Sequence, residues 1–448
     1  MPGTRHAGVT AAAPLPVQAP VPLLFLISDT GGGHRSAAVA VSQALDREYP
    51  GQFAPLLCDP LTGPGSARLL RLVAGLYGPA IRLAPWLWGA AYHACDSAAG
   101  AALLRWSLLW RASGPALAAA RAHRPAVVVS FHPLTGWAAV ACRRALGCAA
   151  VTVITDLATV HATWRAAAVD LLIGPGGPPV ASQFWAGPAG RAERDQARGS
   201  LGLGPAGPGR AGLLIVLAGG GEGSGAIAAQ ATAILRRFSD VRVVAICGRN
   251  QRLRGRLDGL AARAGGALTV LGFTPDMASW LRCADLVVTK AGPGAIAEAA
   301  CCGTPLLLTS QLPGQERGNI EVVTGAGAGR RVRGLSGLLA EIARLRADPA
   351  ALAAMRTAAA RLARPARAAT IAAQIAHHAL PGGPRGVGGW SSTPHKSTAR
   401  AERIASGGSG GRMPPSYPRS ATPGLVPGRA DRVGGCGGRV FMPPTQAQ

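Results

Sequence analysis

The amino-acid sequence predicts an α/β protein of two domains, each with a parallel sheet covered by helices. Short apolar runs alternate with stretches of helical spacing, a pattern typical of βαβ units. The alternation stops after Trp185, in a segment rich in Gly, Pro, Arg and Ala, and restarts at Leu213. Glycine-rich loops follow predicted strands in both halves. Doubly wound domains of this kind bind ligands at the carboxyl ends of their strands.

In the first half, the apolar run at 21–27 passes through a glycine loop into a helix expected to end near Glu48. The sequence predicts three more buried parallel strands there, at 126–130, 149–154 and 170–173. It predicts five strands in the second half, at 213–217, 241–247, 268–271, 286–289 and 305–309. From Leu338 to about Leu380 the spacing is helical, and Asp348 followed by Pro349 is a good N-cap and N1 pair.

These patterns divide the chain into six segments. Disorder is expected at both ends, where apolar periodicity is absent. The segments are a disordered N-terminus at 1–20, an N-terminal domain at 21–186, a linker at 187–211, a C-terminal domain at 212–345, C-terminal helices at 346–380 and a disordered basic tail at 381–448.

The positive charge favours anionic partners. The net charge is +25, and nearly all of the positive charge is Arg, since Lys290 and Lys396 are the two lysines. The first half has no acidic residue between Ser97 and Thr155. Anionic lipid headgroups attract such a surface by roughly 1 kcal/mol per basic residue. Nucleic acid is the competing partner, but no nucleic-acid-binding module is recognisable.

Composition also bounds location and metal chemistry. The nine cysteines lack metal-ligand spacing, and reduced thiols are expected. The N-terminus is too polar for a signal peptide, and no run approaches the roughly 18 apolar residues of a membrane span. No Asp-x-Asp pair follows a predicted strand, so no metal is expected with a nucleotide diphosphate.

The first glycine loop, Gly31–Gly33, precedes His34 at the start of a helix. Consecutive glycines let the backbone approach a ligand, and a helix N-terminus favours negative charge. His34 therefore places a titratable base beside an anion-binding position. The plainer interpretation is a tight turn with a surface histidine.

Two further glycine loops lie in the second half, at 219–225 and 289–294. The second of these leads into a helix with Glu298, whose carboxylate is suited to both hydroxyls of a ribose. After the next strand, Gln315, Glu316 and Asn319 offer amide and carboxylate groups for sugar hydroxyls. Any one loop is also explained as a simple connection. Three glycine loops, each directly after a predicted strand, favour a phosphate-bearing ligand.

A family resemblance rests on seven motifs. In order, they are SDTGGGHRSAA, SFHPLT, VITDLATVHATW, LAGGGEGSG, LGFTPDM, TKAGPGAIAEA and PGQERGN. The chain resembles the monogalactosyldiacylglycerol synthases and the processive diacylglycerol glucosyltransferases of glycosyltransferase family 28, over roughly residues 22–345. The resemblance implies a GT-B fold with two domains facing a cleft. It also implies an inverting, metal-independent transfer of a hexose from a UDP-sugar to diacylglycerol.

The same resemblance implies roles for individual residues. His34 would be the general base, worth roughly 10²–10⁴-fold in rate, with Asp156 or His161 assisting or replacing it. Phe273 and Thr274 would frame the uracil and Glu298 the ribose. Gln315, Glu316 and Asn319 would position the sugar. The residues around the diphosphate would be Gly220, Gly221, Ser224, Gly292, Pro293 and Gly294.

The acceptor side is expected in the N-terminal domain. Gly32, Gly33 and His161 are its predicted loop residues. Residues 69–110 mix tryptophan with arginine, which favours a bilayer interface; core helices have similar composition. The predicted membrane residues are Trp86, Trp88, Trp106 and Trp110. The expected location is cytoplasmic, peripheral on the inner face of the plasma membrane of a bacterial cell. The expected partners are UDP-hexose, diacylglycerol and an anionic membrane, without nucleic acid or cofactor.

Three alternatives stay open. The acceptor can instead be a polyprenyl-linked or other glycolipid intermediate. The chain can be a nucleotide-binding regulator without turnover, although His34 and the Gln315–Glu316 pair disfavour this. A Rossmann dehydrogenase fits less well, because no loop has the required glycine spacing with an acidic residue about 20 positions on.

Overall fold

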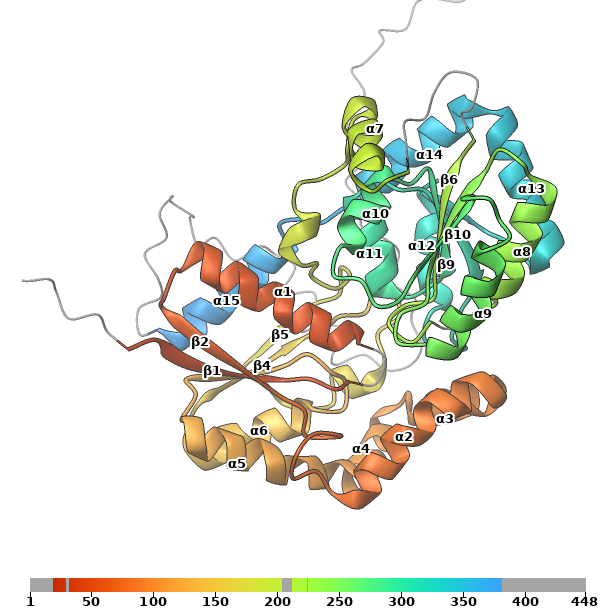
Figure 1. Ribbon diagram of the computed structural model, residues 1–448. Coiled ribbons are helices and arrows are strands. Elements are labelled where there is room, and N and C mark those ends of the chain that lie inside the picture. Colours follow the sequence, from red (N-terminus) through yellow and green to blue (C-terminus); the bar gives the residue numbers. More distant parts are fainter. Residues whose placement is uncertain (1–18, 30–31, 204–211, 224, 381–448) are drawn as a thin grey trace, which may run out of the picture. The chain divides into compact units, whose positions relative to one another are not determined.

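The computed structural model describes residues 19–29, 32–203, 212–223 and 225–380 (Figure 1). These described residues belong to one compact unit that contains two all-parallel sheets. The segments 1–18 and 381–448, for which the sequence predicts disorder, lie outside the described residues.

The first sheet has the order β2-β1-β3-β4-β5. Successive residues of its interior strand β1 face opposite helix layers: Phe25 packs with helices α1 and α15, whereas Leu24 and Leu26 pack with α5 and α6 (Figure 1). This alternation buries both faces of the sheet, as a parallel sheet requires. The elements are β1 (Val21–Leu26), α1 (Gly33–Glu48), β2 (Phe53–Cys58), α5 (Ser113–His123), β3 (Val127–Ser130), α6 (Gly136–Leu146), β4 (Ala149–Val153) and β5 (Leu171–Ile173).

The second sheet has the order β11-β10-β9-β6-β7-β8. Neighbouring residues of its strand β6 also face opposite helix layers. Val216 packs in the hydrophobic cluster of α10, α11 and α12, and Ile215 packs in that of α8, α9 and α13. Its elements are β6 (Leu214–Ala218), α8 (Ile227–Arg237), β7 (Arg242–Ile246), α9 (Gln251–Ala261), β8 (Leu268–Leu271), α10 (Met277–Cys283), β9 (Leu286–Lys290), α11 (Pro293–Cys301), β10 (Leu306–Ser310), α12 (Arg317–Gly325) and β11 (Gly329–Arg331).

The nine predicted strands are confirmed, and two strands were not predicted. Both of these, β2 and β11, are the first strands of their sheets and so lie at an edge. Strand β2 contains Pro55, which an edge strand tolerates. Strand β11 is Gly329-Arg330-Arg331, with no apolar run at all. The proline in β2 and the two arginines in β11 remove the continuous apolar run that identified the other strands, including the edge strands β5 and β8.

The predicted linker at 187–211 contains a helix, α7 (Arg191–Ser200), which corrects the expectation of an irregular segment. The helix is docked by Arg198, which is buried and donates to the carbonyl of Cys283 and, at 2.8 Å, to Asp285 Oδ2. A charged residue on the buried face removes the apolar periodicity by which such a helix is predicted. A short helix, η3 (Ser182–Phe184), precedes it.

The C-terminal helices at 346–380 divide between the two sheets. Helix α13 (Gly334–Ala347) and helix α14 (Pro349–Leu362) pack on the second sheet, and Asp348 caps α14 as predicted, accepting from the Ala351 amide. Helix α15 (Arg367–Ala379) returns to the first sheet, where Ile371 and Ile375 join the core of α1. The first domain therefore includes the end of the described chain.

Between β2 and α5 the chain forms a separate run of helices. These are α2 (Arg68–Leu83), α3 (Pro85–Cys95), α4 (Ala98–Ser107) and the short η1 (Leu109–Ala112). One more short helix, η2 (Ala162–Trp164), follows β4. Within the described residues, no helix has the length and apolar character needed to cross a membrane.

Candidate active site

The loop from β1 to α1 presents open backbone at a helix N-terminus. Gly32 caps α1 in the left-handed region, with φ of 77°, and helix α1 has no acidic residue in its first turn. A Cβ added at Gly32 or Gly33 would meet nothing within 4 Å, so the space beside the loop is open. The first amides of a helix lack intrahelical partners, which suits an anionic or hydroxyl-bearing ligand. Gly31 lies outside the described residues.

His34 is held in one tautomer. Its Nδ1 lies 2.8 Å from the carbonyl oxygen of Phe131 and 3.2 Å from Thr155 Oγ1. Because a carbonyl only accepts, Nδ1 carries the proton and Nε2 carries the lone pair. Burial lowers the pKa of His34 to about 4, although the Phe131 bond opposes this shift. The imidazole is therefore neutral at physiological pH and has the form that a general base requires.

His132, which the sequence analysis did not single out, stands beside His34. The ring centroids are 4.4 Å apart in an edge-on arrangement. The amide of Leu134 donates to His132 Nδ1, at 3.2 Å. Burial lowers the pKa of His132 well below its usual value, and the charge of His34 adds to this. The two rings disfavour each other's protonation. The available sequence signal was the motif SFHPLT, which follows β3 at the carboxyl edge of the sheet.

Asp156 lies near the same edge, after β4. It is buried, and Trp164 Nε1 donates to its Oδ2 at 2.6 Å. Burial raises the pKa of Asp156 to about 7, with the Trp164 bond opposing and the charge of Glu316 contributing. This carboxyl therefore changes charge near neutral pH. Such a shift is common among acid–base groups of active sites.

His161 lies in the loop after β4, directly before η2. Its Nδ1 accepts from the Thr163 amide at 3.2 Å, and its Nε2 donates to the Tyr92 carbonyl at 3.0 Å. Both ring nitrogens are thus occupied by backbone groups. His161 joins helix α3 to the loop after β4, and its expected assisting or replacing role stays a prediction.

The second glycine loop packs against the loop after β7. Gly220 and Gly223 have φ of 71° and 55°, and a Cβ at Gly223 would lie 2.1 Å from the carbonyl oxygen of Cys247. The Arg249 amide donates to the carbonyl of Gly221 at 2.8 Å. Glycine is therefore required at Gly223 by close backbone packing. Ser224 lies outside the described residues.

In the third glycine loop, which follows β9, the ammonium of Lys290 lies close to the glycines. Gly292 caps α11, and Pro293 and Gly294 form its first turn. Lys290, at the end of β9, donates from Nζ to Glu316 Oε1 at 2.7 Å. A Cβ at Gly292 would lie 3.0 Å from Lys290 Nζ, and one at Gly220 would lie 3.8 Å from its Cε. The side chain of Lys290 therefore lies between two glycine loops. Its ammonium is well placed for a diphosphate.

Lys290 was quoted in a motif but received no role from the sequence analysis. A signal was present, because Lys290 is the single lysine before residue 381 in a chain that otherwise uses arginine. A lysine at the end of a strand, before a glycine loop, is a feature of many phosphate sites.

Of the residues predicted to bind the sugar, two are buried and one is partly exposed. The side chain of Glu316 is 2% exposed, with Oε1 bound to Lys290 and Oε2 accepting from the Leu312 amide at 2.8 Å. Asn319 is also buried and donates from Nδ2 to the Ala291 carbonyl. Both side chains hold the loops in place in the structure, and their predicted role in positioning the sugar stays a prediction. Gln315 is partly exposed.

The expected nucleoside residues follow two strands of the second sheet, β8 and β9. Glu298 is on α11, and burial raises its pKa to about 7. Phe273, after β8, is 65% exposed, and the Arg249 guanidinium lies 5.5 Å from its ring centroid. Thr274 Oγ1 accepts from the amide of Asp276. An exposed aromatic ring and an unusually protonated carboxyl are both compatible with a nucleoside, and their assigned roles stay predictions.

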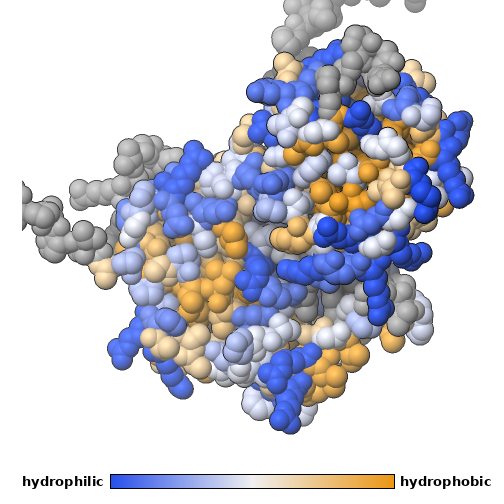
Figure 2. Space-filling view, in the orientation of Figure 1, coloured by the Kyte–Doolittle hydropathy of each residue, from blue (hydrophilic) through white to orange (hydrophobic). Residues whose placement is uncertain are grey.

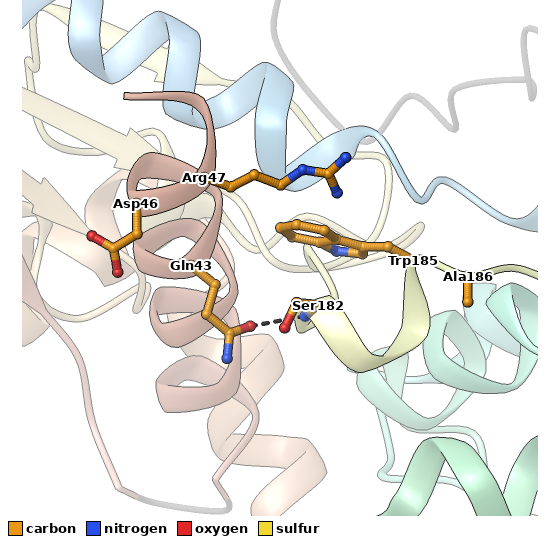
Figure 3. Close-up of a pocket in the computed structure, with 6 residues that line it drawn as sticks. All are labelled: Gln43, Asp46, Arg47, Ser182, Trp185 and Ala186. Carbon is orange, nitrogen blue, oxygen red and sulfur yellow. Dashed lines mark hydrogen bonds between the residues drawn. The ribbon is translucent and has the colours of Figure 1, made fainter. Parts of the chain in front are cut away.

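Among the described residues, no group of three His, Cys, Asp or Glu side chains gathers as a metal site would need. The expectation of a metal-independent reaction stays a prediction. A hollow of about 670 Å³ lies elsewhere, between α1 and the segment after β5 (Figure 3). There Arg47 lies over the Trp185 ring at 5.2 Å, and the Ser182 amide donates to Gln43 Oε1. None of the predicted site residues lines it.

Three of the four predicted membrane tryptophans are at the surface. Trp86, Trp106 and Trp110 are 73%, 80% and 57% exposed, whereas Trp88 is only partly exposed. Figure 2 shows hydrophobic side chains gathered at the lower edge of the view, over α2 to α4. The other exposed apolar residues of these helices are Leu69, Leu72, Val73, Leu76, Leu87 and Leu103.

The sequence is similar to a family model and to monogalactosyldiacylglycerol synthases. The Glycosyltransferase family 28 C-terminal domain matches residues 214–371. A probable monogalactosyldiacylglycerol synthase 2 from Oryza sativa subsp. indica is 30% identical over 375 residues, covering 73% of this chain and 76% of its own length. Monogalactosyldiacylglycerol synthase 3 from Arabidopsis thaliana is 30% identical over 355 residues, covering 68% and 70%. Both are chloroplastic.

Solved structures support the fold. MurG from Acinetobacter baumannii has a TM-score of 0.51 at 17% identity, with 80% of this chain and 99% of that chain covered. The glycosyltransferase of kitacinnamycin has a TM-score of 0.51 at 16% identity, with 81% and 100% covered. The two parallel-sheet domains therefore have the GT-B fold, as the sequence resemblance implied.

Proposed function

Because the chain belongs to the monogalactosyldiacylglycerol synthase family of family 28 glycosyltransferases, we propose that it transfers a hexose from a UDP-sugar to diacylglycerol. The shared family supports a glycosyltransferase that forms a glycolipid. We propose in addition that the donor is a UDP-sugar, that the acceptor is diacylglycerol and that the reaction takes place at a membrane.

The observation that carries the proposal is the position of Lys290. Its ammonium lies between the glycine loops after β6 and β9 and is held by the buried carboxylate of Glu316. A diphosphate in this place would gain a cation and the first amides of helix α11. Glycine at 220 and 292 leaves the backbone accessible to the phosphates. This arrangement suits the leaving group of a UDP-sugar.

The proposed reaction uses His34 at the first sheet and Lys290 at the second. The acceptor hydroxyl oxygen attacks the anomeric carbon from the side opposite the diphosphate, so that a new C–O bond forms with inversion. The bond from the anomeric carbon to the diphosphate oxygen breaks, and its electron pair leaves on UDP. His34 Nε2 takes the hydroxyl proton, and Lys290 offsets the charge on UDP. The raised pKa of Asp156 suits a supporting role in proton transfer.

We further propose that helices α2 to α4 rest on a membrane. Trp86 on α3, Trp106 on α4 and Trp110 on the adjoining η1 are exposed apolar side chains of the kind that a bilayer interface would bury. Arg111 lies 4.7 Å from the Trp110 ring centroid and adds positive charge. Such a surface suits an enzyme whose acceptor is a lipid, bound peripherally to the inner face of the plasma membrane.

The test is product analysis. The purified chain is incubated with each UDP-hexose and with vesicles that contain diacylglycerol, and the lipids are identified by mass spectrometry and NMR. A glycosyldiacylglycerol of inverted configuration is expected. Transfer to a polyprenyl-linked lipid and not to diacylglycerol would show that the proposed acceptor is wrong. Binding of UDP without turnover on any lipid would favour a regulator instead.

A further inference from the structure

Arg249 lies at the carboxyl edge of the second sheet, in the loop after β7. In this sheet β6 has β9 on one side and β7 on the other, and β8 follows β7. Lys290 ends β9, the glycine loop at 219–223 follows β6, and Phe273 follows β8. The glycine loop therefore stands between two neighbouring strands that each bring a cationic side chain to this edge.

The backbone at Arg249 is packed on the glycine loop. The Arg249 amide donates to the Gly221 carbonyl at 2.8 Å. Gly248 has a φ of 57°, and a Cβ there would lie 2.3 Å from the same carbonyl oxygen. Glycine is the residue that permits this close approach. The point from which the Arg249 side chain starts is therefore fixed relative to the loop.

The two cations lie beside consecutive glycines. A Cβ at Gly220 would lie 3.8 Å from Lys290 Cε, and a Cβ at Gly221 would lie 4.0 Å from Arg249 Nη1. Gly220 is exposed and Gly221 is partly exposed, so this part of the loop is accessible to a ligand. A diphosphate carries negative charge on both of its phosphates, and guanidinium and ammonium groups are the side chains that bind phosphate best.

The guanidinium of Arg249 is available to a ligand. The side chain is 53% exposed, and its Nη1 donates at 3.2 Å to Oε1 of Glu222, which is 58% exposed. Exposed ion pairs of this kind contribute little to stability, so a phosphate can take the place of Glu222. The Phe273 ring, with its centroid 5.5 Å from the guanidinium, is a second neighbour that favours this position of the cation.

We propose that Arg249 binds the phosphate of the donor that is attached to the nucleoside, while Lys290 binds the phosphate that carries the sugar. This inference rests on the proposed function. The assignment follows from the order of the strands, because Phe273, the predicted contact of the uracil, lies next to Arg249 and not next to Lys290. Each of the two phosphates would then have one cation.

The test compares Arg249→Gln with Arg346→Gln. Arg346 is the matched control, because it also pairs with an acidic side chain, Asp240, and its guanidinium also lies over a phenylalanine ring, that of Phe238, at 5.0 Å. Arg346 is on α13. Affinities for UDP and UMP are measured by calorimetry and the affinity for uridine by NMR titration. Melting temperatures are measured on the same samples.

Arg249→Gln is expected to weaken the binding of UDP and of UMP by the same factor, about fivefold to thirtyfold, and to leave the affinity for uridine unchanged. This is the size of a charged hydrogen bond made by a half-exposed side chain. The variant should melt near the temperature of the wild type, because the pair with Glu222 is exposed. Arg346→Gln should keep all three affinities.

Unchanged UDP affinity in Arg249→Gln would overturn this inference and leave the proposed function standing. A loss for uridine as large as that for UMP would also overturn it, since Arg249 would then bind the nucleoside or support the fold of the site. A loss for UDP without one for UMP would show that the assignment to the nucleoside-bearing phosphate is wrong. Equal losses in Arg346→Gln would overturn the inference as an effect of net charge. A wild type that does not bind UDP would overturn the proposed function and this inference together.

Discussion

The carboxyl ends of the two sheets differ in whether their buried ionisable side chains are paired with an opposite charge. At the first sheet, His34, His132 and Asp156 are titratable side chains whose pKa values burial has moved toward the neutral form. At the second sheet, Lys290 and Glu316 form an ion pair with fixed hydrogen bonds. Unpaired buried groups change protonation readily, whereas paired ones keep their charge. Glu298 on α11, whose pKa burial raises to about 7, is the exception at the second sheet. Under the proposed function, the groups at the first sheet would move a proton and the Lys290–Glu316 pair at the second would bind an anion.

Replacing the base should have the largest effect. His34→Ala is expected to lower kcat by roughly 10²–10⁴-fold and to leave the Kd for UDP unchanged, because Nε2 acts only on the acceptor hydroxyl. Initial rates at saturating UDP-hexose and calorimetry with UDP measure the two quantities. Full activity in this variant would remove His34 from the mechanism.

Removing the cation should act on binding. Lys290→Ala is expected to weaken UDP binding by roughly tenfold to a hundredfold, the size of a charged hydrogen bond. It should also destabilise the protein, because Glu316 would be left buried and unpaired.

The double variant Lys290→Ala, Glu316→Gln separates these two effects. Stability in urea should largely return, while UDP affinity stays low. Recovery of UDP binding in the double variant would show that Lys290 only neutralises Glu316 and contributes nothing to the diphosphate site.

The carboxyl of Asp156 should be visible in the pH dependence of stability. Its folded pKa is raised from 3.8 to about 7, so the protonated form favours the folded state. This contribution is present at low pH and is lost as the pH rises from about 4 to 7. Asp156→Asn should therefore gain about 2 kcal/mol relative to the wild type between about pH 5 and about pH 8. Urea denaturation at each pH measures this, and parallel curves would contradict it.

The smallest expected effect concerns the apolar surface of the first half. Trp86→Ala combined with Trp106→Ala should weaken binding to anionic vesicles by roughly tenfold without changing UDP affinity. Leu335→Ala, an exposed apolar residue on α13, is the matched control and should bind vesicles normally. Co-sedimentation measures both. If the control loses as much binding, the interaction is not specific to α2 to α4.

The sequence by itself determined the features that are local along the chain. Buried strands followed by glycine loops, the cap of α14 by Asp348, and the motifs of the glycosyltransferase family are all written in neighbouring residues. His34 was found in the same way, because a histidine after a glycine loop and before a helix is a local pattern.

Only the tertiary structure decided what lies beside what. The edge strands β2 and β11, the docking of α7 through Arg198, and the return of α15 to the first sheet depend on residues far away in the chain. The contact of His34 with His132, the two occupied nitrogens of His161, and the pairing of Glu316 with Lys290 likewise come from folding. Periodicity reports whether a residue is buried, but the partner of a buried polar group is chosen by the packing of distant elements.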